Sequence, residues 1–255
     1  MIRRTFPPGW TAVLAWACAS AGVAGPSPDR ADGPAAEACR RAVEAVQAQP
    51  GYTARYEATI HKKGSDPFTQ KGDAVRQGDL FYREGRREEE KEPSVRLFRR
   101  KDRVAVYDAR GEQWLSAGEA GDPGLGQGLE DPDIAMAFLL EAMERAEAGP
   151  STEEAGGVAC RPYQIGLDKK KVARKVQEQY EAAKNLDWEK AEVSAQVLVG
   201  GDPALPRRFR INGVLPGQNA DDGVVTLHIE VQITGYGAVR PLQVPPDAKP
   251  KLGIP

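Results

Sequence analysis

The residues Tyr52-Thr53-Ala54-Arg55-Tyr56-Glu57-Ala58-Thr59-Ile60 alternate between apolar and polar side chains without a break. Successive side chains of a β-strand point to opposite faces, so this alternation predicts a strand with one face in a core and the other toward water. It is the clearest strand signal in the chain, and the rest of the fold can be worked out on both sides of it.

Short apolar runs separated by tight turns continue from this strand through most of the chain. Gln77-Gly78 and Lys101-Asp102 are hairpin-type turns, and Asp202-Pro203 and Pro216-Gly217 mark later turns. About ten strands joined in this way indicate a mostly antiparallel sheet. The expected strands are 52–60, 68–76, 79–85, 95–100, 103–108, 113–115, 158–167, 193–199, 207–214 and 224–233.

Three helices are expected at defined points around these strands. Residues 34–49 carry an apolar stripe at helical spacing, and Pro50-Gly51 ends it. A second helix begins at Asp131-Pro132, with Asp as N-cap and Pro at the first helical position. A third runs over 168–187 from Asp168. The fold class is therefore α+β, with one large, strongly curved antiparallel sheet and no internal repeat.

The second helix contains Ile134 to Leu140, which is apolar on every side. Such a helix must be covered on every side, which places it between the sheet and another layer. One interpretation is ordinary core. The other is a wall of a ligand cavity, for which the flexible side chains of Met136 and Met143 are suited.

The N-terminus has the pattern of a secretory signal. A cationic start, an uncharged apolar stretch and small residues at the exit predict a signal peptide over 1–24, followed by a flexible leader over 25–33. Arg3-Arg4 leaves twin-arginine export open beside the general route, and an acylated Cys18 is an alternative that would anchor the chain to a membrane. The expected location is the periplasm or cell envelope.

Charge and cysteine content narrow the function further. The chain has 35 Lys and Arg against 37 Asp and Glu, a formal net charge of −2, which offers no general attraction for nucleic acid. A membrane surface is a weaker expected partner, through the basic residues around Arg96 to Arg103. In an oxidising compartment Cys39 and Cys160 predict one disulfide, and two free buried thiols are the alternative.

Catalytic and metal-binding patterns are missing from the sequence. His61 and His228 stand apart on strands, without HxH or HExxH spacing, and no P-loop, nucleophile elbow or CxxC is present. We therefore expect a protein that is not an enzyme and that uses neither cofactor nor metal.

Three short motifs resemble one superfamily. They are the strand-to-helix passage Tyr163 to Asp168, the segment Val197 to Arg210 with Leu205-Pro206-Arg207, and the end of the chain from Ile233 through Tyr236-Gly237 to Pro245-Pro246. Together with the order of elements, they resemble the periplasmic lipoprotein carriers of the LolA type and the LppX/LprG-type lipid-binding lipoproteins of mycobacteria. The sequence departs from the pattern at Val197-Leu198-Val199-Gly200, where an aromatic-acidic pair is expected.

The resemblance implies one LolA-like domain over 34–248, with a tail over 249–255. Its sheet would form an incomplete barrel whose concave face, closed by helices, holds a lipid or the acyl chains of a lipoprotein. The residues that would line this cavity are Tyr56, Val104, Val106, Trp114, Phe138, Leu139 and Met143. The alternative is an envelope protein-interaction or sensory module with a filled core.

Overall fold

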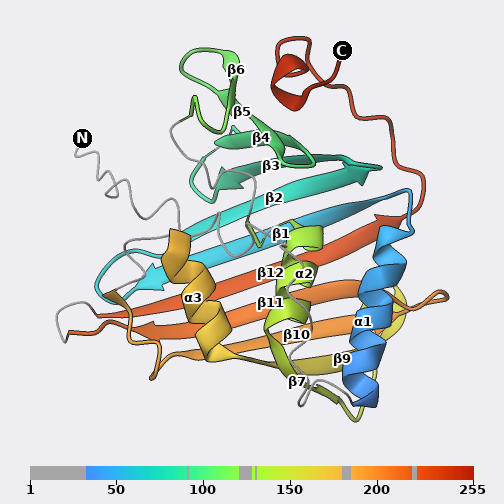
Figure 1. Ribbon diagram of the computed structural model, residues 1–255, viewed down its shortest axis with the longest axis vertical. Helices are drawn as coiled ribbons and strands as arrows, with labels where there is room; N and C mark the ends of the chain where they lie inside the picture. Colours follow the sequence, from blue (N-terminus) through green and yellow to red (C-terminus); the bar gives the residue numbers. More distant parts are fainter. Residues whose placement is uncertain (1–32, 91, 121–127, 130, 180–184, 220–222) are drawn as a thin grey trace.

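The computed structural model describes residues 33–90, 92–120, 128–129, 131–179, 185–219 and 223–255. The predicted signal peptide, Cys18 and all but the last residue of the predicted leader lie outside these residues. The described part forms one sheet with three α-helices (Figure 1).

The sheet has 12 strands, and every pairing in it is antiparallel. Their order is β6-β5-β4-β3-β2-β1-β12-β11-β10-β9-β7, with β8 paired to β9. Since β6 and β7 are its two edges, the sheet stays open, as an incomplete barrel requires. The strands are β1 (Gly51–Lys62), β2 (Phe68–Gln77), β3 (Leu80–Arg87), β4 (Val95–Arg100), β5 (Arg103–Asp108), β6 (Gln113–Ser116), β7 (Met143–Ala148), β8 (Glu153–Ala155), β9 (Val158–Leu167), β10 (Glu192–Gly200), β11 (Leu205–Pro216) and β12 (Val224–Tyr236).

The helices α1 (Pro34–Gln47), α2 (Pro132–Ala142) and α3 (Lys169–Gln179) lie on the same face of the sheet (Figure 1). The first two agree with the sequence analysis, but α2 stops before Met143, whose backbone is extended and begins β7. The third is shorter than predicted, because Leu186 already forms a β-bridge with Gly217. Within the described residues, no helix has the length and apolar character needed to cross a bilayer.

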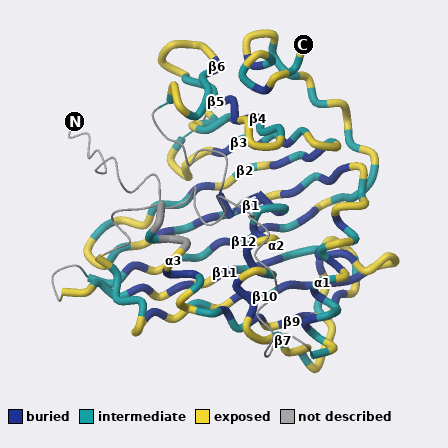
Figure 2. Tube along the Cα trace, in the orientation of Figure 1, coloured by how far each residue is buried: buried dark blue, intermediate teal, exposed yellow. Residues whose placement is uncertain are grey.

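Strand β1 sits in the middle of the sheet, between β12 and β2. Tyr52, Ala54, Tyr56, Ala58 and Ile60 are buried, whereas the residues between them are partly or fully exposed, as the alternation predicted (Figure 2). The buried positions pack in one cluster with the inner sides of α1 and α2. The period of two in this strand thus decides which face of the sheet carries the helices.

The C-terminal residues belong to the folded protein. After β12 the chain crosses the face opposite the helices and ends in the short helix η4 (Pro250–Leu252). Ala248 and Leu252 pack there against Phe98, Ala105 and Trp114 in a second cluster. The prediction of a tail over 249–255 is therefore wrong, because Leu252 is only 1% exposed.

Tyr56 fills a gap that two glycines leave on the helix-bearing face. Gly72 of β2 lies opposite Tyr56, and Gly85 of β3 lies opposite Gly72. The Tyr56 ring extends across both of them, and its hydroxyl donates to the carbonyl of Glu84 at 3.3 Å. Neither glycine has room for a side chain while the ring is in this place, so the packing of β1 on β2 and β3 depends on both.

We predict that Gly85→Ala destabilises the protein by about 2 kcal/mol or more, because its Cβ would overlap the Tyr56 hydroxyl. Urea unfolding would measure this. Removing the hydroxyl with Tyr56→Phe should recover part of the loss in the double variant, since the next ring atom is 3.1 Å from that Cβ position. Equal unfolding midpoints for wild type and Gly85→Ala would show that the ring does not occupy this gap.

Candidate functional site

The space between the three helices and the sheet collects most of the large apolar side chains of the described residues. One cluster joins Phe209, Ile211, Ile229, Val231 and Ile233 of the sheet to the buried sides of the helices. Val214 is the only large hydrophobic side chain exposed in the part of the chain that the structure describes. The inner, helix-bearing face therefore carries the largest apolar cluster of the described residues.

Most of the predicted cavity residues are in this cluster. Tyr56, Phe138, Leu139 and Met143 are buried members, and Val106 packs against them. Val104 is buried two residues before Val106 on β5. The structure thus places five of the seven predicted residues in one cluster, whereas their contact with a ligand stays a prediction.

Trp114 lies elsewhere. It packs with Phe98 and Tyr107, at ring-centroid distances of 5.3 and 5.4 Å, in the cluster that the C-terminal segment covers. Its register partner on β5 is Tyr107, whereas Val106 pairs with the following residue, Leu115. Placing Trp114 in the same cavity as Val106 was therefore wrong, because neighbouring residues of a strand face opposite sides of the sheet.

The predicted disulfide is also wrong. Cys39 and Cys160 are both free and buried. Cys39 on α1 belongs to the main cluster, whereas Cys160 on β9 packs with Ala155 and Leu198 in a small separate cluster. Burial raises the pKa of the Cys39 thiol to about 11, so this cysteine is an inert apolar side chain rather than a nucleophile.

Helix α2 is covered on most of its circumference but not on all of it. Ala135, Met136, Phe138, Leu139 and Ala142 are buried, whereas Ala137 and Glu141 are exposed. These two residues are four apart and form one solvent-facing stripe. The sequence-based expectation of a helix enclosed on every side is thus wrong for this stripe.

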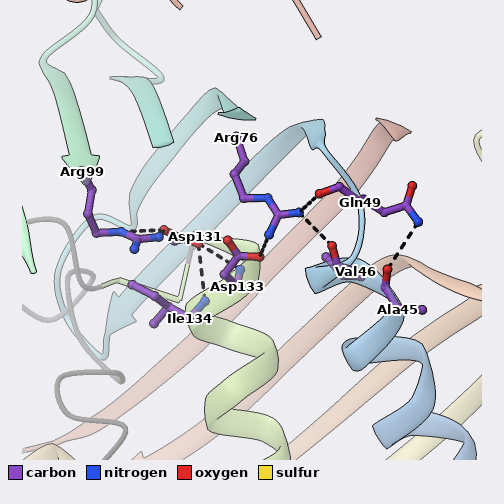
Figure 3. Close-up of polar contacts among 8 residues, drawn as sticks. All are labelled: Ala45, Val46, Gln49, Arg76, Arg99, Asp131, Asp133 and Ile134. Carbon is purple, nitrogen blue, oxygen red and sulfur yellow. Dashed lines mark hydrogen bonds and ion pairs between the residues drawn. The ribbon is translucent and has the colours of Figure 1, made fainter. Parts of the chain in front are cut away.

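A polar network holds the N-terminus of α2 to the sheet (Figure 3). The Asp131 carboxylate divides its two oxygens between two tasks. Oδ1 accepts from the backbone N–H groups of Asp133 and Ile134, at 2.9 and 3.4 Å, which confirms the predicted N-cap. Oδ2 accepts from Arg99 of β4, whose Nε lies at 3.1 Å and whose Nη2 completes the ion pair. Asp131 is only 2% exposed, so its charge depends on these partners.

Arg76 of β2 joins α2 to the end of α1. Its Nη2 donates to the carbonyl oxygens of Val46 and Gln49, both at 2.8 Å, and its Nη1 lies 3.5 Å from Asp133 Oδ1 (Figure 3). Carbonyls at a helix C-terminus have no partner within the helix, and a cation satisfies them well. A single guanidinium group therefore couples two helices to the middle of the sheet.

The network extends along one row of cross-strand neighbours. Tyr52, Arg76, Phe81 and Arg99 lie opposite one another on β1, β2, β3 and β4. Arg76 stacks over the Tyr52 ring at 5.0 Å and Arg99 over the Phe81 ring at 5.2 Å. The sequence analysis did not identify Arg76 and Arg99. Each stands at a helix-facing position of its strand, where a charged residue indicates a buried pair.

Asp133 has an unusual protonation equilibrium in this network. Burial and the neighbouring Asp131 carboxylate raise the pKa of Asp133 to about 6, and Arg76 opposes them. Burial also raises the pKa of Tyr52 well above its ordinary value. The hydrogen bonds and ion pairs of Asp131, Arg76 and Arg99 fasten α2 to the sheet and to α1.

Small side chains lie beside this row on the helix-bearing face. Ala54 of β1 and Ala74 of β2 are direct register partners, and both are buried. Ala58 is also buried, two residues after Tyr56 on the same face of β1. Alanine side chains are smaller than the leucines and isoleucines typical of a sheet packed on helices.

Two pockets formed by described residues lie on the other face. One has a volume of about 830 Å³ and runs between Tyr82, Phe98 and Trp114 and the chain after β12. The other, of about 480 Å³, lies between mixed charges such as Arg55, Glu57 and Lys71. Neither is the predicted dry space between helices and sheet.

Groups for metal binding do not converge in the described part of the chain. No three His, Cys, Asp or Glu side chains there are placed to hold a metal ion. His228 Nδ1 lies 2.7 Å from Asn212 Oδ1 in an exposed pair, and His61 lies apart from it on the neighbouring strand.

The solved structures that resemble this one include LolA-like and LppX-like proteins, as the sequence resemblance predicted. One is the lipoprotein LppX of Mycobacterium tuberculosis, with 13% identity, a TM-score of 0.49 and coverage of 82% of this chain and 97% of that chain. A LolA superfamily protein of Nitrosomonas europaea has 10% identity and a TM-score of 0.32 over 82% of this chain and 94% of the other. No protein-family model and no curated protein matches the sequence.

A third similar structure is MucB in complex with the periplasmic part of MucA, with 12% identity and a TM-score of 0.37 over 84% of this chain and 60% of that chain. All three likenesses concern the fold alone. The function is therefore argued from the contacts of this chain itself.

We predict a pH dependence of stability that comes from Asp133. Between about pH 4 and pH 6 the folded protein keeps a proton on Asp133 that the unfolded chain has released, so the free energy of unfolding falls as the pH rises through this window. Asp133→Asn should lack this contribution. Urea unfolding measures this. From pH 4 to pH 7 the free energy of unfolding of the wild type should fall by roughly 1–2 kcal/mol more than that of Asp133→Asn.

Asp102→Asn, an exposed change in the β4–β5 turn, is the matched control and should follow the wild-type profile. Parallel profiles for wild type and Asp133→Asn would contradict the raised pKa.

Proposed function

We propose that this chain is an exported, non-catalytic protein that binds a lipid, or the acyl chains of a lipoprotein, between its helices and its sheet. The observation that carries the proposal is the distribution of apolar side chains. In the described residues their largest cluster lies under α1, α2 and α3, and Val214 alone is exposed among the large ones. The helices would close the concave face of the open sheet, and the acyl chains would lie beneath them.

The alanines of β1 and β2 support a place for the ligand. Ala54, Ala58 and Ala74 are small and buried on the face that would hold it, and Met136 and Met143 supply flexible walls nearby. Transfer of an acyl chain from water into such a place contributes about 0.8 kcal/mol per methylene. A chain of about a dozen methylenes would reach micromolar affinity or better after the cost of association.

The polar residues of this face support binding rather than catalysis. Asp131 caps α2 and pairs with Arg99, and Arg76 is committed to carbonyls of α1. Groups held in this way fix the helices in place. Export through the predicted signal peptide would deliver the protein to the periplasm or cell envelope, with Cys18 as a further point of attachment if it is acylated.

A filled-core interaction module is the second candidate. It is favoured by two pockets on the face away from the helices, which offer a partner a place on the outer surface. In this candidate the side chains of the protein would fill the space beneath α2, and partners would bind on the outer surface.

Mass spectrometry of the protein purified without delipidation tests the binding of acyl chains directly. We expect acyl species at a fixed ratio to protein, because a dry apolar space retains its ligand through purification. Protein that is consistently empty after expression in several hosts would contradict the proposal.

Ala54→Leu separates the two candidates. If acyl chains occupy the space above β1, the added atoms should displace them and leave the melting temperature unchanged or raised. If the core is already filled, overpacking should cost about 1–3 kcal/mol, which calorimetry would show as a lower melting temperature. Ala137→Leu makes the same change on the exposed stripe of α2 and should alter neither acyl content nor melting temperature.

A further inference from the structure

The face opposite the helices carries its own pocket, of about 830 Å³. The floor is formed by residues of β1, β2, β3, β4, β6 and β12, and the roof is the chain from Ala238 to Pro245 that leaves β12. Pockets of roughly 300–1,000 Å³ are the usual size for small-molecule sites. The proposed acyl-binding space lies on the other side of the sheet, so this pocket is separate from it.

The roof of the pocket is fastened at both ends. The backbone N–H of Leu242 donates to Gln77 Oε1 of β2 at 2.9 Å. Further along, Lys251 Nζ lies 2.7 and 2.6 Å from the two carboxylate oxygens of Glu119, and Arg100 donates to the carbonyl of Gly253 at 3.2 Å. These contacts hold the segment over the strands, so the pocket is formed before any ligand arrives and little ordering cost remains for binding.

Aromatic rings line the floor. Tyr82 and Phe98 have centroids 4.7 Å apart, and Phe98 and Trp114 have centroids 5.3 Å apart, both pairs at tilted angles. Val75 and, from the roof, Leu242 add aliphatic surface. Rigid rings of this kind match a flat or cyclic apolar body better than a long flexible chain.

The charges in the pocket are unequal. Its one carboxylate, Glu84, already accepts the Tyr82 hydroxyl at 2.8 Å. Arg96 lies opposite Glu84 in register but forms no ion pair in the described part of the chain, and its guanidinium lies 5.5 Å from the Tyr107 ring centroid. Arg240 in the roof is exposed and likewise makes no ion pair with a described carboxylate. The guanidinium groups of Arg96 and Arg240 thus face a pocket that has one carboxylate, Glu84, which already accepts a hydrogen bond from Tyr82.

We propose that this pocket binds a small amphipathic organic anion, with a flat or cyclic apolar body against Tyr82, Phe98 and Trp114 and a carboxylate or sulfonate group at Arg96. A guanidinium group pairs with such an anion through two parallel hydrogen bonds. A neutral ligand would fill the apolar part but would leave Arg96 without a partner of opposite charge.

The probe for this proposal is 8-anilinonaphthalene-1-sulfonate, which has an aromatic body and one anionic group and becomes fluorescent when bound. N-phenyl-1-naphthylamine has the same rings without the sulfonate and serves as the neutral comparison. Titration of the full chain should show saturable binding of the sulfonate probe, at least tenfold tighter than binding of the neutral probe and weakened by salt.

Arg96→Gln should weaken the sulfonate probe about tenfold and leave the neutral probe unchanged, whereas Arg96→Lys should keep most of the affinity. Arg86→Gln is the matched control, because Arg86 is exposed on the same face of β3 but outside this pocket. Circular dichroism checks that each variant is folded.

Equal affinity of the wild type for the two probes, or equal loss in Arg96→Gln and Arg86→Gln, would overturn the proposal. The comparison of probes on wild type needs no variant, so it decides the matter even if Arg96→Gln does not fold. The titrations are made with the proposed acyl-binding space saturated by the methyl ester of a fatty acid, which blocks probe binding there, so their outcome is independent of the proposed function.

Discussion

The structure depends on the central strand β1, which places its apolar side chains on one face of the sheet and its polar side chains on the other. Its period of two sends Tyr52, Ala54, Tyr56, Ala58 and Ile60 to one face and polar residues to the other. Since β1 pairs with β12 on one side and β2 on the other, the same sorting extends through both halves of the sheet. The inner face becomes apolar enough to hold three helices, and the outer face is left for the C-terminal segment.

The helix layer is then held by charge as well as by apolar contact. A short row of arginines and aromatic rings on β1 to β4 lies beneath the N-terminus of α2, where Asp131 and Asp133 are found. Buried pairs of this kind add little to net stability, but breaking one leaves an uncompensated charge and is costly. The arrangement therefore fixes where α2 begins on the sheet, while the apolar remainder of the helix rests on side chains that can adapt to a ligand.

Much of this fold could be read from the sequence, because alternation and turn residues act locally. All ten predicted strands form, and Asp131 caps its helix. The strands that were missed, β7 and β8, are short and charged edge strands without apolar alternation. The errors about Trp114, Cys160 and the C-terminus concern which face of the sheet a residue occupies. The predicted three-residue strand at Trp114 and the proline-rich C-terminal segment give no periodicity from which to decide this. Cys160 lies on the ten-residue strand β9, but the strand pattern does not say which of its faces the helix with Cys39 covers.

The central claim is that acyl chains lie on the helix-bearing face. Nuclear magnetic resonance with a neutral spin-labelled lipid, the methyl ester of a doxyl-labelled fatty acid, tests it directly. The account predicts that the label broadens the methyl signals of Ile211, Ile229 and Val231, which belong to the main cluster. The methyl signals of Leu252 and Ile254, in the C-terminal segment on the opposite face, should be broadened less. Broadening confined to the second set, or none at all, would contradict the account.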